Sequence, residues 1–195
     1  MDGLSEFALV CLGSNAPGGQ SAATSFVLFG RRRLVEELGE DGLRMSRLYA
    51  TPAFPAGIGP DFVNAAIAVR TDLPPDRVLA ALHAIEAEAD RTRTVRWGQR
   101  TLDLDLIALG DEVRPDAAAQ TRWRHLPPAA QRSAAPDDLI LPHPRMQDRA
   151  FVLVPLAEVA PSWVHPLTGQ SVAQMRDALP AADLAQVTVL EHNGT

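Results

Sequence analysis

The alternation of apolar and polar residues predicts several short strands and two long helices. Residues 7–12 form a short apolar run that ends at Gly13-Ser-Asn15, which is typical of a buried strand followed by a turn. Apolar residues then recur at helical spacing over about 21–38, and Gly39 follows as a stop signal. Gly30 weakens this helix prediction, because glycine is unfavourable inside helices.

Three further strands and a second helix follow. The patterns at residues 43–49, 62–69 and 101–109 predict strands. A helix opens at Leu73-Pro-Pro-Asp76 and continues to about Asp90, since proline is well tolerated in a first helical turn. The order strand, helix, strand, strand, helix, strand is that of ferredoxin-like folds. We therefore expect an α+β protein whose helices cover one face of a largely antiparallel sheet, with C-terminal additions.

The chain after this core is less regular. Residues 112–138 predict an irregular excursion with one short helix, in which Trp123 and His125 are interpreted as packing and surface residues. Either Ser171 or Thr168 is expected to cap a short helix near the C-terminus. The elements predicted beyond the excursion are a strand within 139–144, a helix at 148–160 that Pro155 ends or kinks, a helix at 171–179, a strand at 186–190 and a disordered tail at 191–195.

Composition narrows the class of protein. The chain has 195 residues, which fits a single domain over 1–195, and 46% of them are hydrophobic. Its net charge of -6 argues against general nucleic-acid binding. Cys11 is the only cysteine and lies in an apolar run, so we interpret it as an inert buried thiol. Without a basic leader or an apolar run of membrane-spanning length, the sequence predicts a cytoplasmic protein.

Two acids and a group of arginines carry the first chemical signal. The strand pattern places Asp103 and Asp105 on one face and the leucines between and beside them on the other. Such a pair is tolerable around Mg²⁺, which prefers one or two carboxylates plus substrate phosphates and water. The arginines that precede the pair suit phosphate, and they are Arg91, Arg93, Arg96 and Arg100. The acids and the arginines each also fit a solvated surface; together they indicate chemistry on a nucleotide.

A neighbouring strand offers a second signal. Period two places Phe62 and Asn64 on one face, and Val63 and Ala65 on the other. Asn64 either bonds nearby backbone at a turn or recognises the edge of an amide-like heterocycle, with Phe62 as a flat apolar surface beside it. The preceding stretch, residues 51–60, holds three prolines and two glycines and predicts a long loop.

These residues occur in the order of a known family. The motifs are Leu12-Gly-Ser-Asn15, Tyr49-Ala-Thr-Pro52, Asp61-Phe-Val-Asn-Ala-Ala66, Arg96-Trp-Gly-Gln-Arg-Thr-Leu-Asp-Leu-Asp105, Leu141-Pro-His-Pro144 and Arg149-Ala-Phe151. Over about residues 7–161 the sequence resembles 6-hydroxymethyl-7,8-dihydropterin pyrophosphokinase, an enzyme of folate biosynthesis. The resemblance implies transfer of the terminal pyrophosphate of ATP to the hydroxymethyl group of the pterin, leaving AMP.

The resemblance also implies roles at the nucleotide. Two Mg²⁺ ions would be held by Asp103 and Asp105, and Arg100 would be the better catalytic candidate beside Arg91. ATP would further contact His83, Glu86, Arg93, His143 and Arg149, with His83 standing where the family often has glutamine. The partners would be ATP and the pterin alone, with no nucleic acid or membrane, and a monomer is expected.

For the pterin, the family uses side chains corresponding to Phe62, Asn64, Trp97 and Phe151, and backbone corresponding to Thr51, Pro52 and Phe54. The loops at about 50–60 and 91–100 would close over the site and exclude water. Three features depart from the family: Pro144 replaces an aromatic residue, Ala16 replaces the usual leucine, and the excursion at 114–138 is longer than in compact members. That excursion would either cover the nucleotide or mediate association.

Two alternatives remain open from the residues. Gly13-Ser14 and the Asp103–Asp105 pair match the letters of a nucleotidyltransferase, but in that class the two motifs lie close together. A ferredoxin-like domain that binds RNA would also use arginines and Trp97, although the acidic net charge disfavours it.

Overall fold

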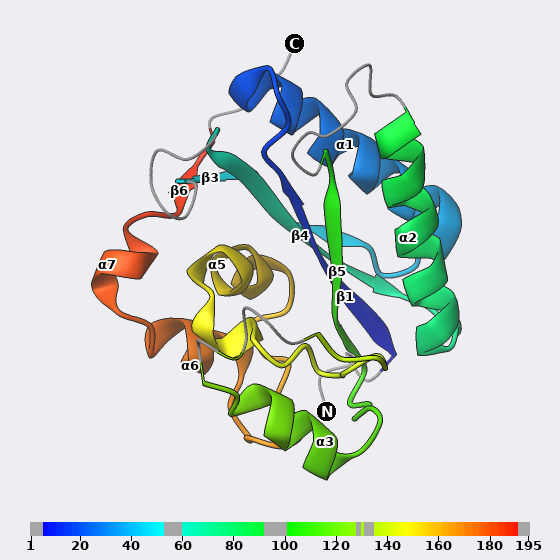
Figure 1. The fold of residues 1–195 in the computed structure, drawn as a ribbon, viewed down its shortest axis with the longest axis vertical. Coiled ribbons are helices and arrows are strands. Elements are labelled where there is room, and N and C mark those ends of the chain that lie inside the picture. The colour runs from blue at the N-terminus through cyan, green and yellow to red at the C-terminus, as the bar shows by residue number, and fades with distance from the viewer. Residues whose placement is uncertain (1–5, 53–59, 92–100, 128–129, 131–134, 191–195) are drawn as a thin grey trace.

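The computed structural model describes residues 6–52, 60–91, 101–127, 130 and 135–190 of the chain (Figure 1). A six-stranded sheet runs through it in the order β5-β1-β4-β3-β6, with β2 also paired to β4. All pairs of these strands are antiparallel. The strands are β1 Phe7–Ser14, β2 Arg44–Met45, β3 Tyr49–Thr51, β4 Phe62–Arg70, β5 Asp103–Leu109 and β6 Thr188–Val189.

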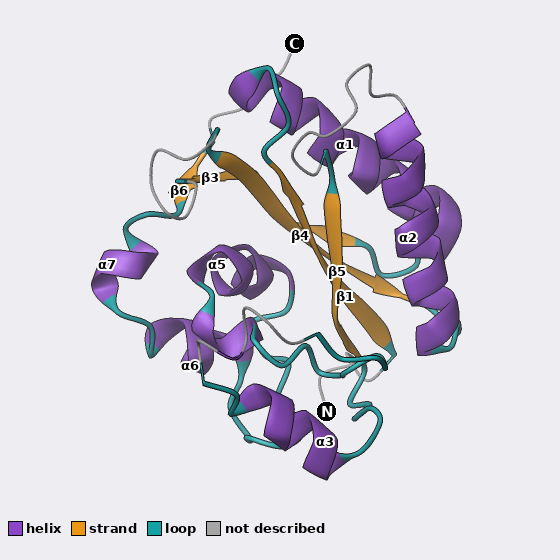
Figure 2. Cartoon of the chain, in the orientation of Figure 1, coloured by secondary structure: helices purple, strands orange, loops and turns teal. Residues whose placement is uncertain are grey.

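Helices pack on both faces of this sheet (Figure 2). Helices α1 (Gly19–Leu38) and α2 (Pro75–Arg91) cover one face, and α5 (Ala150–Val159) with α6 (Val172–Asp177) covers the other. The ferredoxin-like α+β core is confirmed, and its two helices α1 and α2 cover one face as expected; the cover of the other face by α5 and α6 was not predicted. The reason lies in β1, whose Phe7, Leu9 and Cys11 are apolar and buried like the residues that alternate with them. Both faces of the central strand therefore need cover.

A glycine sets the distance between α1 and the sheet. A Cβ atom built on Gly30 would lie 3.0 Å from Cδ2 of Leu102 and 3.3 Å from Cδ2 of Leu12. Such separations are shorter than ordinary van der Waals contact. The residue that weakens the helix prediction is therefore the one that lets α1 approach the strands.

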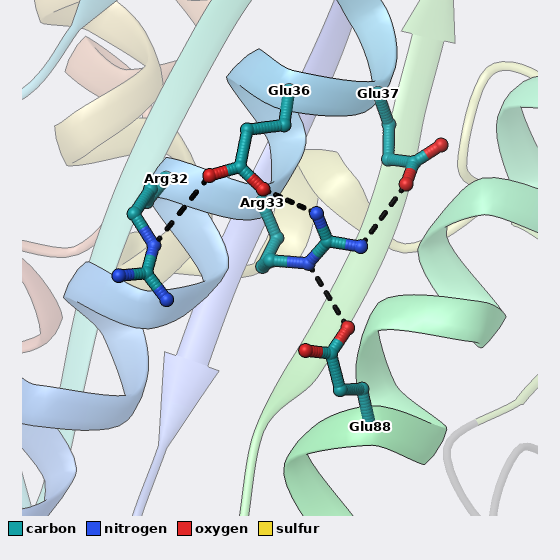
Figure 3. A network of polar contacts seen from close by, with 5 residues as sticks. All are labelled: Arg32, Arg33, Glu36, Glu37 and Glu88. Atoms are coloured by element: carbon teal, nitrogen blue, oxygen red, sulfur yellow. Dashed lines mark hydrogen bonds and ion pairs between the residues drawn. The ribbon is translucent and has the colours of Figure 1, made fainter.

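An ion-pair network joins α1 to α2 on the surface (Figure 3). The guanidinium of Arg33 contacts Glu36 and Glu37 one turn further along α1, and its Nε lies 2.9 Å from Oε2 of Glu88 on α2. Arg32 adds a longer contact to Glu36. Because partly exposed pairs contribute little to stability, this network orients the two helices more than it stabilises them.

Two strand predictions differ from the structure. The segment 43–49 divides into β2 and β3, because the Ser46 hydroxyl accepts the N–H of Ala66 at 2.8 Å and interrupts the ladder. The segment 139–144 forms only an isolated bridge, between Leu141 and Arg114. Pro142 and Pro144 lack N–H donors, so a longer ladder cannot form there.

The C-terminal part also contains differences. Helix α5 continues through Pro155 and ends at Val159, so Pro155 does not end the helix. Ser171, and not Thr168, caps α6 in a capping box with Gln174. Three short helices complete the description: α3 Ala117–Arg124, η1 Met146–Asp148 and α7 Ala181–Leu184. Of these, η1 and α7 were not predicted. No described helix is long and apolar enough to cross a membrane.

Replacing Gly30 with valine is expected to destabilise the protein by about 1–3 kcal/mol, because the side chain must displace Leu102 and Leu12. The melting temperature should fall by roughly 3–10 °C. Ser25→Val, on the exposed face of the same helix, is the matched control for the introduction of a β-branched residue. Equal melting temperatures for the two variants would contradict the close packing at Gly30.

Candidate active site

Two cavities meet at the acid pair of β5. The first, of about 480 Å³, lies between α2, β5 and the chain around residues 136–149. The second, of about 540 Å³, lies between the ends of β1, β4 and β5, the start of α5, and residues 183–187. Asp103, Asp105 and Arg149 line both cavities. Ligands bound in the two cavities would therefore meet at these three side chains.

The strand register explains how the carboxylates are presented. Asp103 pairs with Gly13 and Asp105 with Cys11 on β1, while Leu104 between them packs in the core on the opposite face. The predicted alternation is thus confirmed. Both acids are partly buried. Among the described residues no cluster of three metal-binding side chains forms, so a cation here would need ligand oxygens or water to complete its coordination.

Glu86 attaches helix α2 directly to β5. Its Oε1 accepts the backbone N–H of Leu104 at 2.7 Å, between the two acids. One turn further along α2, Asp90 Oδ1 accepts the hydroxyl of Thr101 at 3.0 Å. Glu86 and His83, two residues to which the family resemblance drew attention, both line the first cavity. The helix therefore forms a wall of the cavity and fixes the strand that carries the acids.

The opposite wall carries a neutral histidine between two arginines. The backbone N–H of His143 donates to Ile107 O of β5 at 2.8 Å, and the N–H of Arg145 donates to the ring Nδ1 at 3.1 Å. Burial, followed by the charges of Arg149 and Arg145, lowers the pKa of His143 to about 3. The proton of the neutral ring is therefore assigned to Nε2, which makes it a hydrogen-bond donor.

Arg145 lines the first cavity together with His143 and Arg149. Burial and the charge of Arg149 lower its pKa. Two guanidinium groups and an imidazole N–H donor on one wall suit an anionic ligand. The sequence analysis did not single out Arg145, although it lies between the Leu141-Pro-His-Pro and Arg149-Ala-Phe motifs.

The second cavity holds the predicted recognition residues of β3, β4 and α5. Asn64 is 5% exposed, and its Nδ2 donates to the Thr51 hydroxyl at 2.8 Å. The structure contradicts the first interpretation of Asn64, in which it bonds nearby backbone at a turn, because Asn64 lies within β4 and its amide bonds a side chain. Phe62 lines the same cavity, and Val63 and Ala65 lie in the core behind it, so the predicted faces of β4 are confirmed.

Pro52 and Phe151 also line the second cavity, and Phe151 is 39% exposed. The guanidinium of Arg149 lies 5.6 Å from the centre of the Phe151 ring. An exposed phenyl ring in a cavity offers a flat apolar surface to a ligand.

Several predicted residues lie outside the described parts of the chain. Phe54, Arg93, Trp97 and Arg100 fall in undescribed segments. Arg91 ends α2, and its side chain is not described.

The structure adds residues that sequence reasoning missed. Gly13 lines the second cavity, and a Cβ built on it would lie 3.2 Å from Oδ1 of Asn64, so glycine leaves room beside the amide. Cys11 lines the same cavity; burial and Asp105 raise the pKa of its thiol, in keeping with the inert role predicted. Trp123, interpreted as a packing residue, lines the first cavity. The available sequence signal for Gly13 was its place in the Leu12-Gly-Ser-Asn15 motif.

Comparison with known proteins identifies the family. The family model described as 7,8-dihydro-6-hydroxymethylpterin-pyrophosphokinase matches residues 9–161. The chain belongs to this family. The match includes β3, β4, β5, α2 and α5, and thus every helix and strand that brings a predicted, described residue to the two cavities.

Two bacterial relatives show the extent of the likeness. The 2-amino-4-hydroxy-6-hydroxymethyldihydropteridine pyrophosphokinase of Synechocystis sp. is 42% identical over 132 residues, which cover 68% of this chain and 57% of the relative. The enzyme of the same name from Pseudomonas aeruginosa is 35% identical over 175 residues, which cover 88% of this chain and 90% of that enzyme. The chain thus matches less than two thirds of the length of the first relative.

Solved structures share the fold. A crystal structure of an HPPK-DHPS protein in complex with substrates superposes with a TM-score of 0.62 at 13% identity, over 88% of this chain and 44% of that chain. The wild-type HPPK-DHPS of Plasmodium falciparum gives a TM-score of 0.56 at 15% identity, with the same shares of both chains. At these identities the likeness concerns the fold.

Glu86→Ala should leave the N–H of Leu104 without its side-chain acceptor and destabilise the protein by about 1–3 kcal/mol. Amide hydrogen exchange at Leu104 should accelerate, whereas Glu86→Gln, whose amide oxygen still accepts, should resemble the parent. Arg77→Ala, exposed on the same helix, is the control for loss of a charged side chain. Unchanged exchange at Leu104 in Glu86→Ala would contradict the role of Glu86 in holding β5.

Proposed function

We propose that this protein transfers pyrophosphate from ATP to 6-hydroxymethyl-7,8-dihydropterin, giving AMP and the pterin diphosphate, in folate biosynthesis. The observation that carries the proposal is the junction of two cavities at Asp103 and Asp105. Family membership supports the same reaction. A reaction between two substrates needs two neighbouring sites that share one reacting centre.

ATP is assigned to the first cavity. The cationic wall of Arg145 and Arg149, with the Nε2–H of His143, provides charge-assisted donors for phosphate oxygens. His83 and Glu86 line the facing wall. Family resemblance adds Arg93 and Arg100, which precede β5 in the sequence.

The pterin is assigned to the second cavity. Phe62 and Phe151 offer apolar surfaces to its flat ring, and Trp97 is proposed to complete the enclosure. Asn64 presents an amide to the amino-oxo edge of the heterocycle, since its Nδ2 is held by Thr51 and its Oδ1 lies beside Gly13. Backbone of Thr51, Pro52 and Phe54 is proposed to contact the same edge.

Asp103 and Asp105 are proposed to hold Mg²⁺, with two ions expected. The donor set fits this group: two carboxylates on one strand face, both partly buried and both open to the two cavities. When bound, Mg²⁺ supplies neutralisation of charge on the ATP phosphates. The chain's own residues orient the substrates and exclude water from the junction.

The proposed step is a displacement at the β-phosphorus of ATP. The hydroxymethyl oxygen forms a bond to this phosphorus, the bond between it and the α,β-bridging oxygen breaks, and AMP leaves with that oxygen while the hydroxyl proton is released. Such transfers depend mainly on positioning and electrostatic stabilisation. Arg100, with Arg91, is proposed to stabilise the charge on the transferred group.

Asp103→Asn and Asp105→Asn should each lower Mg²⁺-dependent AMP release by about a thousandfold or more, because each loses a carboxylate charge at the junction. AMP formation from ATP is measured with and without the hydroxymethyl pterin. Asp111→Asn, exposed just after β5, is the matched control and should retain activity. Near-normal turnover in both variants would exclude the metal role.

The product distinguishes the alternatives. A nucleotidyltransferase would release pyrophosphate and form a nucleotidyl ester, and an RNA-binding domain would form neither product. Detection of AMP and a pterin diphosphate excludes both.

Gly13→Ala is expected to weaken pterin binding about tenfold, because the added methyl presses on Oδ1 of Asn64 at 3.2 Å. Binding of a non-hydrolysable ATP analogue should change little, because Gly13 does not line the first cavity. Calorimetric titration of each ligand measures the two affinities. Equal weakening of both would indicate a general distortion of β1 instead.

A further inference from the structure

The excursion at 112–138 contributes a large aromatic side chain to the first cavity. Trp123, on helix α3, lines this cavity together with Leu79 of α2 and Leu139. The indole is partly exposed, and neither hydrophobic core of the described chain includes it. A tryptophan that faces a cavity without belonging to a core is available to a ligand.

Helix α3 is firmly attached to the cavity wall. The Asp116 side chain accepts the N–H of Ala119 at 2.8 Å and caps the helix. Gln120 is 0% exposed, and its Nε2 donates to Pro142 O at 3.1 Å, one residue before His143. Because residues three apart share a helix face, the buried bond of Gln120 also holds the position of Trp123.

Helix α3 lies at the end of the first cavity that is farther from Asp103 and Asp105. Figure 1 shows α3 beyond the end of β5, whereas Asp103 stands at its start. Along α2, Leu79 lies seven residues before Glu86, which corresponds to roughly 10 Å of helix from the Glu86–Leu104 contact. The cavity thus has two acids and arginines at the junction, whereas Leu79, Leu139 and Trp123, with Asp138 next to Leu139 in the chain, line it further away.

We infer that Trp123 recognises the nucleobase of ATP, with its indole packed against the purine, so that the excursion supplies base recognition to this site. The inference rests on the proposed function, in which the phosphates lie at the junction. A nucleoside triphosphate carries its planar, least charged part farthest from the transferred phosphates. An indole suits such a base, since stacking of aromatic side chains on bases is favourable for every base.

This role belongs to binding rather than to the chemical step. Trp123 lies far along the cavity from the reacting phosphorus, so it is a specificity-determining residue for the nucleotide. Loss of the indole should therefore raise KM for ATP and leave kcat nearly unchanged.

The test compares Trp123→Ala and Trp123→Phe in the full chain, with Arg122→Ala as the control on the exposed side of the same helix. Trp123→Ala should raise both KM for ATP and the Kd of α,β-methylene ATP about tenfold, with kcat within about twofold. The KM and Kd values of Trp123→Phe should lie between those of Trp123→Ala and the parent. The values of Arg122→Ala should equal those of the parent.

Inorganic tripolyphosphate separates base recognition from a general effect on the cavity. It lacks a base, so its Kd should be the same for Trp123→Ala and the parent. Parent-like affinity of Trp123→Ala for α,β-methylene ATP, or an equal loss of tripolyphosphate affinity, would overturn the inference. If Trp123→Ala does not fold, parent-like affinity of Trp123→Phe for α,β-methylene ATP overturns it.

The measurement of α,β-methylene ATP binding also distinguishes failure of this inference from failure of the proposed function. If the parent releases no AMP with the pterin but binds α,β-methylene ATP in a Trp123-dependent way, the reaction is wrong and the base recognition stands. If AMP is released normally by Trp123→Ala at low ATP concentration, the reaction stands and the base recognition fails.

Discussion

The site depends on the hydrogen bonds that attach β5 to helix α2 and to the segment around His143. Through Leu104 N–H this strand bonds Glu86 of α2, and through Ile107 O it accepts the N–H of His143. Because β5 lies at the edge of the sheet, these two bonds replace part of the ladder that a further strand would supply. The walls of the first cavity are therefore bonded to the backbone that carries Asp103 and Asp105.

Two glycines allow close approach of neighbouring groups on the two faces of the sheet. On the helical face, Gly30 lets α1 approach Leu102 and Leu12 closely. On the cavity face, Gly13 leaves room next to Asn64, in the row of the sheet that also holds Asp103. At each position a methyl group would press on a neighbour, so packing and site geometry constrain the same strands.

On the wall of the first cavity that holds His143, the positive charge comes from arginines. Burial and two arginines keep His143 neutral, so its ring donates a hydrogen bond while the arginines carry the positive charge. The two acids at the junction and the arginines around it provide opposite charges at one place. Beyond them, Leu79 and Leu139 line the cavity, and it is there that the excursion adds Trp123.

The sequence alone determined the properties that local geometry controls. Strand alternation placed Asp103 with Asp105, and Phe62 with Asn64, because side chains of a strand point to opposite faces in turn. The family motifs likewise contain His143 and Arg149 of the first cavity and Phe151 of the second. Only the tertiary structure decided the break at Ser46, the single bridge at Leu141, the cover on both faces and the cavity role of Trp123. The break at Ser46 and the position of Trp123 depend on partners distant in the chain, Ala66 for Ser46 and Pro142 for Gln120, which no local pattern encodes.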